Sequence, residues 1–317
     1  RAIESSTARH HSAKNYAHDA QRRALSDHLE RQGKKAELIS IDGIHWRVRY
    51  PLPERPPKTS IIIPTKDRHD LISQCIDSIL EKTTYPNYEL LVVDNQTSDP
   101  QALEYLSEIQ KNPRVKVLPY DSDFNYSAIN NYAVRQSDAE VICLLNNDTE
   151  VITPGWLEEL VSHAIRPEVG VVGAKLLYPD DHIQHAGIIL GIDGVAKHAF
   201  RFLHKNDFGH VHRANLISQW SAVTGACMAL RRETWRELGG LNEQNLSVAY
   251  NDVDLCLRAR DAGYRTLLTP YALLYHKEST TRGFDQTPEQ LALHHTEAAY
   301  MYRRWPSPMQ RDPFYNP

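Results

Sequence analysis

The chain has 317 residues, and 36 Lys and Arg against 40 Asp and Glu give it a formal charge of −4. That balance argues against a nucleic-acid binder that neutralises phosphates with a basic face. Hydrophobic residues make up 41% and charged residues 24%, which excludes the disordered class and predicts a packed core. No apolar run approaches the roughly 20 residues that cross a bilayer, and no secretory signal is visible, so we expect a cytoplasmic protein.

Cysteine and histidine usage favours neither a disulfide framework nor a zinc site. The 16 histidines form no H-E-x-x-H motif, so most are expected to be packing or surface residues. The cysteines are scattered without a C-x-x-C pair and are expected to be reduced and buried: Cys75, Cys143, Cys227 and Cys256.

The first 57 residues predict an appendage. Residues 5–32 form a polar helical pattern that ends at Gly33. Two alternating runs, 37–41 and 44–50, flank Asp42-Gly43, a pair typical of a type I′ hairpin turn. The proline-rich linker that follows predicts a new domain from residue 58. Because the sequence begins with Arg rather than Met, we expect a piece of a longer chain with further domains.

From residue 58 short apolar strands alternate with amphipathic helices. Strands are predicted at 60–64, 88–94, 114–120, 140–146 and 169–177, and helices at 69–81, 100–111, 125–137 and 154–165. This pattern is typical of an α/β fold with a mostly parallel, Rossmann-like sheet and helices on both faces. Ligands of such sheets bind at the carboxyl ends of the strands.

The later half is more mixed. A hairpin is predicted around 191–194, an apolar stretch at 221–232, a helix at 252–262 and a strand at 264–276. We therefore expect a main domain over 58–281 and a helical tail over 282–317, with one helix at 288–304.

Polar side chains follow three of the predicted strands. The phosphate-binding motifs G-x-G-x-x-G and G-x-x-x-x-G-K-[ST] are absent from the sequence, which excludes dinucleotide-dependent dehydrogenases and P-loop enzymes. Instead, Asp67 lies just past the first predicted strand, Asp94-Asn95 ends the second and Asn146-Asn147-Asp148 ends the fourth, all at one edge of the predicted sheet. Taken singly, each could be an ordinary turn or helix-cap residue.

Six segments carry a family resemblance: SIIIPTKDR (60–68), YELLVVDNQTSD (88–99), LLNNDTEV (144–151), SAVTGACMALRRETWRELGGLNE (221–243), NDVDLCLRARDAGYR (251–265) and YHKEST (275–280). Together they resemble a family 2 glycosyltransferase of the GT-A fold, the inverting enzymes that use nucleotide-diphosphate sugars. The pattern is similar to bacterial surface-polysaccharide transferases, notably O-antigen rhamnosyltransferases.

The resemblance implies a divalent-metal site with Mg²⁺ or Mn²⁺. Asp148 matches the last residue of the family's D-x-D-type motif and would bind the ion that bridges the two donor phosphates. The motif departs from its usual form, because Asn146 and Asn147 leave a single carboxylate. His276 matches a position where the family often supplies a further ligand, and the alternative is a packed histidine at a strand end.

The resemblance also assigns a general base. Asp252 matches the second residue of the family's E-D motif, with Asn251 in place of the acid, and would take the proton from the acceptor hydroxyl. The alternative is that both residues cap the helix that follows. Asp254 is interpreted as a structural or acceptor-binding residue.

The donor and acceptor sides follow in the same way. Asp94 matches the family's uracil- or thymine-recognising aspartate, and its carboxylate can accept the N3–H of a pyrimidine dione, which favours dTDP- or UDP-sugars. The other nucleotide contacts implied are Pro64, Thr65, Asp67 and Asn95. Contacts to the diphosphate or donor sugar are implied for Asn125, Asn130, Asn146, Asn147 and Arg282. The acceptor side would hold Trp220, Thr224, Gly225 and Asp254, with Trp220 either stacking on a sugar or lying in the core.

The predicted function is thus an inverting transfer of a sugar to a hydroxyl of a growing bacterial surface glycan. The Q-x-x-R-W element of processive relatives is missing, which favours a distributive enzyme, and a lipid-linked acceptor would bring it to the inner membrane face. One alternative is a nucleotidyltransferase, but the glycine-rich loop that it needs does not follow the first strand. The other is a catalytically silent module that binds nucleotide or glycan within a larger polysaccharide-assembly protein.

Overall fold

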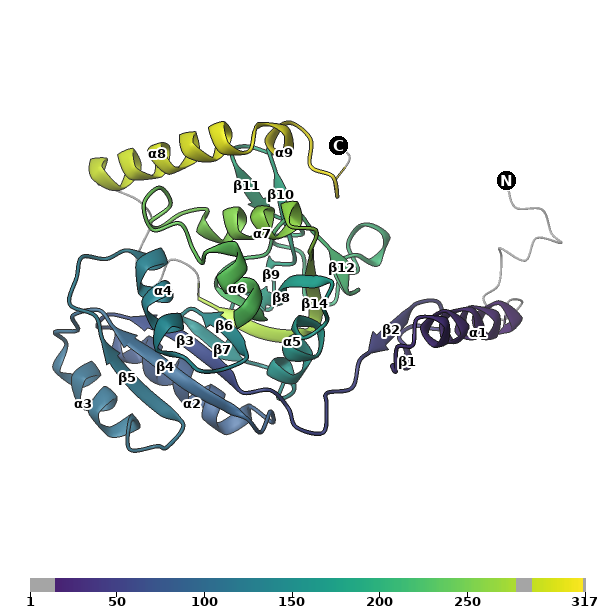
Figure 1. Cartoon of the computed structure of the whole chain (residues 1–317), viewed down its shortest axis with the longest axis horizontal. Coiled ribbons are helices and arrows are strands. Elements are labelled where there is room, and N and C mark those ends of the chain that lie inside the picture. Colours follow the sequence, from purple (N-terminus) through teal and green to yellow (C-terminus); the bar gives the residue numbers. More distant parts are fainter. Residues whose placement is uncertain (1–14, 278–286, 316–317) are drawn as a thin grey trace. The chain divides into compact units, whose positions relative to one another are not determined.

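The computed structural model describes residues 15–277 and 287–315, which fall into two compact units, Arg1–Pro53 and Glu54–Pro317 (Figure 1). The described part of the first unit contains helix α1 (Asn15–Arg31) and an antiparallel hairpin of β1 (Glu37–Ser40) and β2 (Trp46–Arg49). The helix and the hairpin are confirmed over these residues.

The turn of the hairpin differs from the prediction. A type I′ turn requires positive φ at both central residues, but Asp42, unlike Gly43 with φ 76°, does not have one. The Asp42 carboxylate instead accepts hydrogen bonds from the backbone amides of Ile44 at 2.9 Å and His45 at 2.7 Å. These bonds form an Asx-type turn within a wider loop. A short carboxylate side chain competes with backbone carbonyls for the amides of the residues that follow it.

The second unit is built on a sheet whose described strands run in the order β12-β14-β8-β13-β6-β3-β4-β5, with β7 beside β14 and β9 beside β8. The strands of this sheet are β3 (Thr59–Thr65), β4 (Tyr88–Asp94), β5 (Val115–Pro119), β6 (Val141–Leu145), β7 (Thr149–Val151), β8 (Val169–Leu177), β9 (Ile183–His185), β12 (Ser218–Gln219), β13 (Cys227–Arg231) and β14 (Arg265–His276). A separate hairpin pairs β10 (Ile188–Leu190) with β11 (Ala196–His198) and confirms the one predicted around 191–194.

Strand direction changes within the sheet. The strands β6, β3, β4 and β5 are parallel, as are β8 and β14. Between these groups β13 runs antiparallel to both β6 and β8. The α/β class is confirmed, and the sheet is mixed rather than uniformly parallel around β13. Because of this reversal, the chain enters β13 at the same edge where β6 and β8 end.

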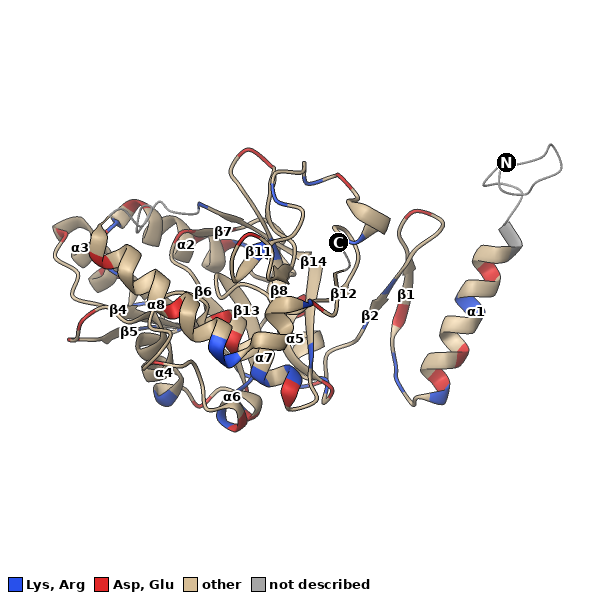
Figure 2. Ribbon diagram, turned by 90° about the horizontal axis from the view of Figure 1, so that it is seen from above, with Lys and Arg blue, Asp and Glu red and all other residues tan. Residues whose placement is uncertain are grey.

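Helices cover both faces of the sheet. In Figure 2, α2 (His69–Lys82) and α3 (Pro100–Ile109) lie on one side, and α4 (Tyr126–Gln136) and α6 (Arg232–Leu238) on the other. The remaining described helices are α5 (Trp156–Ala164), the 3₁₀ turn η2 (His210–His212), α7 (Asn251–Asp261), α8 (Pro288–Arg304) and α9 (Pro306–Gln310). None of the helices in the described segments is long and apolar enough to span a membrane.

The core explains the apolar strands of the sequence. Every residue of β6 and β8 is buried, as expected of strands that are covered on both faces. All four cysteines are free and buried. The end of the chain also joins this core, since Met301, Trp305 and Met309 of the α8–α9 region belong to the same buried cluster. The described part of the predicted tail thus packs within the second unit.

A glycine in β8 sets the distance between the sheet and the segment that precedes β13. A Cβ at Gly173 would lie 2.5 Å from Val223 Cβ, well inside van der Waals contact. We predict that Gly173→Ala lowers the free energy of unfolding by about 1–3 kcal/mol, because the overpacked strand must shift. Urea denaturation measures this loss. The control is Gly155→Ala, where a Cβ meets open space, and equal unfolding midpoints for the two variants would contradict the prediction.

Candidate active site

The polar residues predicted at the strand ends do converge on one edge of the sheet. Thr65, the last residue of β3, pairs in register with Asp94, the last residue of β4. The 146–148 segment follows β6 directly, and His276, at the end of β14, pairs with Thr149 of β7. The carboxyl ends of parallel strands meet at a common edge, so residues far apart in the sequence become neighbours.

Asp148 and His276 form the central pair of this edge. Asp148 Oδ1 lies 3.3 Å from His276 Nε2, and each residue is 6% exposed. On the other side of the ring, His276 Nδ1 is 3.3 Å from Gln184 Oε1. A proton on Nδ1 that is donated to Gln184 leaves the Nε2 lone pair directed at Asp148. Two acceptor atoms this close require a proton or a cation between them.

The pair fits a divalent cation. An octahedral ion with bonds of about 2.1 Å places neighbouring ligand atoms about 3 Å apart, close to the separation observed between Asp148 and His276. The two asparagines contribute less to such a site. Asn147 Nδ2 donates to Thr65 Oγ1 at 3.1 Å, and Asn146 Nδ2 lies 3.5 Å from His276 Nε2. Among the described residues, one carboxylate and one imidazole are therefore the main ligands offered here.

Asp252 lies in the first turn of α7. Its Oδ2 accepts a hydrogen bond from the Gly225 amide at 2.8 Å, and its Oδ1 accepts one from the Val253 amide at 2.7 Å. Burial raises the pKa of the Asp252 carboxyl above its ordinary value, although these amides and the Thr224 side chain oppose the shift. Each carboxylate oxygen has a further lone pair, so Asp252 can still accept a proton from a ligand.

The hydroxyl of Tyr126 joins the two halves of the site. It lies 3.1 Å from the Gly225 carbonyl and 3.3 Å from Asn146 Oδ1, so its hydrogen is shared between two acceptors. Burial raises the pKa of Tyr126, which keeps the hydroxyl protonated as a donor. The chain of contacts thus runs from His276 through Asn146, Tyr126 and Gly225 to Asp252.

Sequence reasoning missed Tyr126 and Gln184. Tyr126 lies between two of the asparagines that the family pattern selected, but an aromatic residue at a helix start usually indicates a core residue. Gln184 belongs to β9, which pairs antiparallel with the edge-forming end of β8. No local pattern marks Gln184 as the partner of a histidine 92 residues away.

The predicted nucleotide residues lie at the ends of β3 and β4. Asp94 Oδ1 accepts from the Thr97 amide at 2.9 Å. Asp67 Oδ1 accepts from the amides of Ser98 at 2.6 Å and Asp99 at 2.8 Å, and these bonds lower the pKa of its carboxyl. Asp67 therefore ties its own loop to the loop after β4. Pro64 is the one half-exposed residue of β3.

Three of the predicted asparagines are used by the backbone. Asn125 caps α4 by accepting from Ala128 N at 2.9 Å. Asn95 Nδ2 donates to the carbonyls of Tyr120 at 3.1 Å and Ser122 at 2.8 Å. Asn130 is fully buried and donates to the Tyr126 carbonyl at 2.8 Å. Asn125 is thus a helix cap, Asn95 joins its turn to the segment after β5, and Asn130 bonds back to the preceding turn of its own helix.

Trp220 lies in the core, the second of the two alternatives that the sequence left open, and is not placed to stack on an acceptor sugar. It is 2% exposed, and the Arg213 guanidinium lies 4.0 Å from its ring centroid. The Phe200 ring meets it edge-on at 5.9 Å. The physical reason is the close passage of Gly187, where a Cβ would lie 2.3 Å from the indole. Thr224, by contrast, lies at the edge, with its amide 3.4 Å from His185 Nε2.

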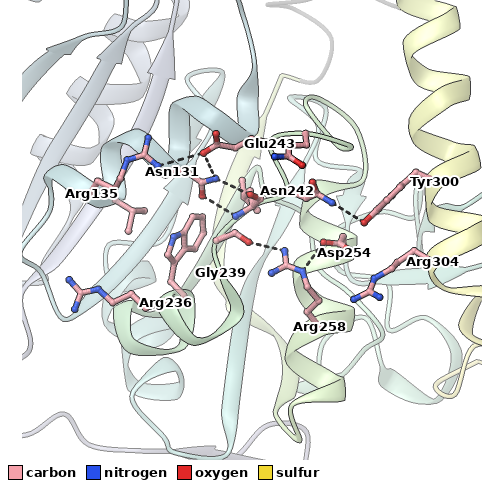
Figure 3. Close-up of a pocket in the computed structure, with 15 residues that line it drawn as sticks. Asn131, Arg135, Arg236, Gly239, Asn242, Glu243, Asp254, Arg258, Tyr300 and Arg304 are labelled. Atoms are coloured by element: carbon pink, nitrogen blue, oxygen red, sulfur yellow. Dashed lines mark hydrogen bonds and ion pairs between the residues drawn. The ribbon is translucent and has the colours of Figure 1, made fainter.

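Asp254 is buried and fully engaged by side chains of the second unit, which favours the structural alternative over acceptor binding. It is 1% exposed, and its two oxygens accept from Arg258 Nε at 2.7 Å and Trp305 Nε1 at 2.9 Å. It contributes to the wall of a groove of about 820 Å³ between α4, α6, α7 and α8, where Arg258 reaches it (Figure 3). Arg282, the last predicted donor contact, lies outside the described residues.

The fold and the polar edge agree with one protein family. A family model described as "Glycosyl transferase family 2" matches residues 60–239. The chain belongs to this family of glycosyltransferases.

Two relatives and one solved structure place the chain further. It is 46% identical over 320 residues to the uncharacterized protein y4gI of Sinorhizobium fredii, covering 100% of this chain and 35% of that protein. It is 44% identical over 299 residues to the O-antigen biosynthesis protein RfbC of Myxococcus xanthus, covering 93% of this chain and 23% of that protein. The chain therefore spans about a third or less of the length of these relatives.

The solved structure is a mannosyltransferase of Pyrobaculum calidifontis, PcManGT, in complex with GDP-Man and Mn²⁺. The TM-score is 0.55 at 16% identity, over 95% of this chain and 82% of that one. This likeness confirms the GT-A glycosyltransferase fold.

The shared hydroxyl of Tyr126 gives a testable consequence. We predict that Tyr126→Phe lowers the free energy of unfolding by about 1–2 kcal/mol, because the Gly225 carbonyl and Asn146 Oδ1 lose their donor. Urea denaturation checks this. The matched control is Tyr132→Phe on the same helix, whose ring packs on Tyr120 at 5.5 Å and whose hydroxyl bonds no described residue. Equal losses in both variants would show that the Tyr126 hydroxyl bridges nothing.

Proposed function

We propose that this chain transfers a sugar from a nucleoside-diphosphate donor to a hydroxyl of a bacterial surface glycan, with inversion at the anomeric carbon. The observation that carries the proposal is the meeting of Asp148 and His276 at one edge with Asp252, whose carboxylate the Gly225 amide holds at the start of β13. A cation-binding pair and a separate carboxylate are the two groups that inverting transfer needs.

The cation would be Mg²⁺ or Mn²⁺, held by Asp148 and His276. A carboxylate and an imidazole can ligate either ion, and the Mn²⁺ in the structurally similar mannosyltransferase supports a divalent metal. Such an ion supplies charge neutralisation for the departing diphosphate. Gln184 would keep the imidazole in the tautomer that presents Nε2 to it.

Asp252 would act as the base. The acceptor oxygen forms a bond to the anomeric carbon while the bond from that carbon to the phosphate oxygen breaks. The hydroxyl proton passes to Asp252, and the bonding electron pair leaves with the diphosphate. Burial raises the pKa of this carboxyl, and a raised pKa strengthens the carboxylate as a proton acceptor.

Asp94 supports a dTDP- or UDP-sugar as the donor. Among the described residues its hydrogen bond from Thr97 engages Oδ1, and Oδ2 would accept the N3–H of thymine or uracil. Pro64 and Thr65 would line the base and ribose. The acceptor would approach Thr224 and Gly225, beside Asp252.

The acceptor class rests on the relatives. The similarity to an O-antigen biosynthesis protein supports a growing, lipid-linked glycan, which would be reached at the inner face of the membrane. Because both relatives are much longer than this chain, partner domains would complete the protein. The single carboxylate of the Asn146–Asp148 motif keeps a silent nucleotide-binding or glycan-binding module as the second candidate.

Donor hydrolysis tests the proposal. The chain is incubated with dTDP-rhamnose, UDP-glucose or GDP-mannose, in Mn²⁺, Mg²⁺ or EDTA, and free nucleotide is measured. We expect turnover of one donor that needs metal, falls by at least about a hundredfold in Asp148→Ala and Asp252→Asn, and falls about tenfold or more in His276→Ala. Asp252→Asn should still bind nucleotide. Tight nucleotide binding without turnover of any donor would contradict the enzyme and favour the silent module.

The pH dependence of turnover tests the base. Only the ionised carboxylate accepts a proton, so activity should rise with pH through the pKa of Asp252. Because burial raises this pKa, the acid limb of the kcat profile should lie above the pH range of an ordinary aspartate. The residual rate of Asp252→Asn should lack this limb. An acid limb that persists in the variant would assign it to another group.

A further inference from the structure

A buried carboxylate on α8 holds the loop that precedes Asp252. Glu297 is 1% exposed. Its Oε1 accepts from Ser247 Oγ at 2.8 Å and from the Val248 amide at 3.0 Å, and its Oε2 accepts from the Ala249 amide at 2.6 Å. Three donors surround this one carboxylate. Their hydrogen bonds offset the free-energy cost of burying the Glu297 charge.

The residues that Glu297 holds lead directly into the first turn of α7. Tyr250, the next residue, caps that helix with φ 59° and ψ 5°, a left-handed conformation that a bulky residue adopts only under constraint. It provides no side-chain capping bond to the helix. Asn251 Nδ2 donates back to the Val248 carbonyl at 2.9 Å. The orientation of the Asp252 side chain in this first turn therefore depends on contacts from outside α7.

Helix α8 supplies further contacts from the same face. Residues spaced three or four apart share a helix face, and His294, Glu297 and Tyr300 have this spacing. Tyr250 Oη lies 2.9 Å from His294 Nε2. Asn242 Nδ2 donates to Tyr300 Oη at 3.0 Å, a contact that Figure 3 shows. One face of α8 thus contacts the loop at Asn242 and at Tyr250, and Glu297 lies between these two contacts.

Helix α4 holds the opposite side of the same loop. Asn131 Oδ1 accepts from the Leu241 amide at 2.9 Å, and its Nδ2 donates to the Leu241 carbonyl at 2.9 Å. The Ser127 amide donates to the Ser247 carbonyl at 3.2 Å. The loop is fixed between two helices at its other contacts. A displacement caused by a change at Glu297 therefore moves the backbone next to Asp252.

We propose that Glu297 is a positioning residue of the transferase, which aims Asp252 at the acceptor by fixing the 247–249 backbone. The inference rests on the proposed role of Asp252 as the base. Without the Glu297 carboxylate, the Val248 and Ala249 amides lose their acceptor and the constraint on Tyr250 is released. The first turn of α7 then shifts, and with it the Asp252 carboxylate.

The test is Glu297→Gln, which keeps the size of the side chain but turns an amide NH₂ toward one of the loop donors. The matched control is Glu289→Gln, an exposed position on the same helix. We expect kcat for the hydrolysed donor to fall about tenfold to hundredfold, because small displacements of a reacting group are costly. The KM for donor and the affinity for dTDP or UDP with Mn²⁺ should stay within about twofold, since the nucleotide binds elsewhere. The control should match wild type.

Hydrogen–deuterium exchange of the same proteins gives a readout that does not need turnover. Amides of residues 246–253 should exchange faster in Glu297→Gln, whereas those of β4 should not change. If the glutamine variant does not fold, Ser247→Ala removes one donor to Glu297 and should lower kcat severalfold, again without changing nucleotide affinity.

Parallel assays of Asp252→Asn separate the two proposals. If Asp252→Asn keeps its activity, the proposed base is wrong. If Asp252→Asn is inactive while Glu297→Gln retains wild-type kcat, or if exchange at 246–253 is unchanged, the positioning role of Glu297 is overturned. A fall in nucleotide affinity equal to the fall in kcat would show a general structural role and would also overturn it.

Discussion

Strand β13 runs antiparallel between β6 and β8, and the position of the whole candidate site depends on this reversal. Its amino end lies beside the carboxyl ends of its two neighbours, so the segment before it meets the loop after β6. The Gly225 amide can therefore bind Asp252, and the Gly225 carbonyl can accept from Tyr126. A parallel strand in this place would have taken that segment to the opposite edge of the sheet, away from Asp148 and His276.

Four carboxylates in this region are buried to different degrees, and their partners decide what each can do. Asp254 accepts from the Arg258 and Trp305 side chains, whereas Glu297 accepts from the backbone of one loop, so one joins side chains and the other holds backbone in place. Asp148 faces an imidazole nitrogen whose lone pair can share a cation with it. Asp252 meets neutral amides, and burial raises its pKa. It therefore remains available for proton transfer, which a cationic partner would disfavour.

Much of the fold was predictable because its elements are locally determined. The strands at 88–94 and 169–177 and the helix at 288–304 have the predicted bounds, since continuous apolar runs and helical periodicity are local patterns. The turn prediction failed where a single side chain competes with a pattern, because the Asp42 carboxylate reorganised the expected type I′ turn. The choice between core and sugar stacking for Trp220 depended on Gly187, which lies far from it in the sequence.

The sequence by itself determined the family, the α/β class and the positions of Asp148, Asp252 and His276 at the ends of elements, because motif order and periodicity are properties of the linear chain. Only the tertiary structure decided which polar groups work together. The Tyr126 hydroxyl and the Glu297 carboxylate join residues 20 to 99 positions apart. Such contacts depend on strand order and helix packing, and the energy of a buried hydrogen bond appears only when the chain has brought both partners out of water.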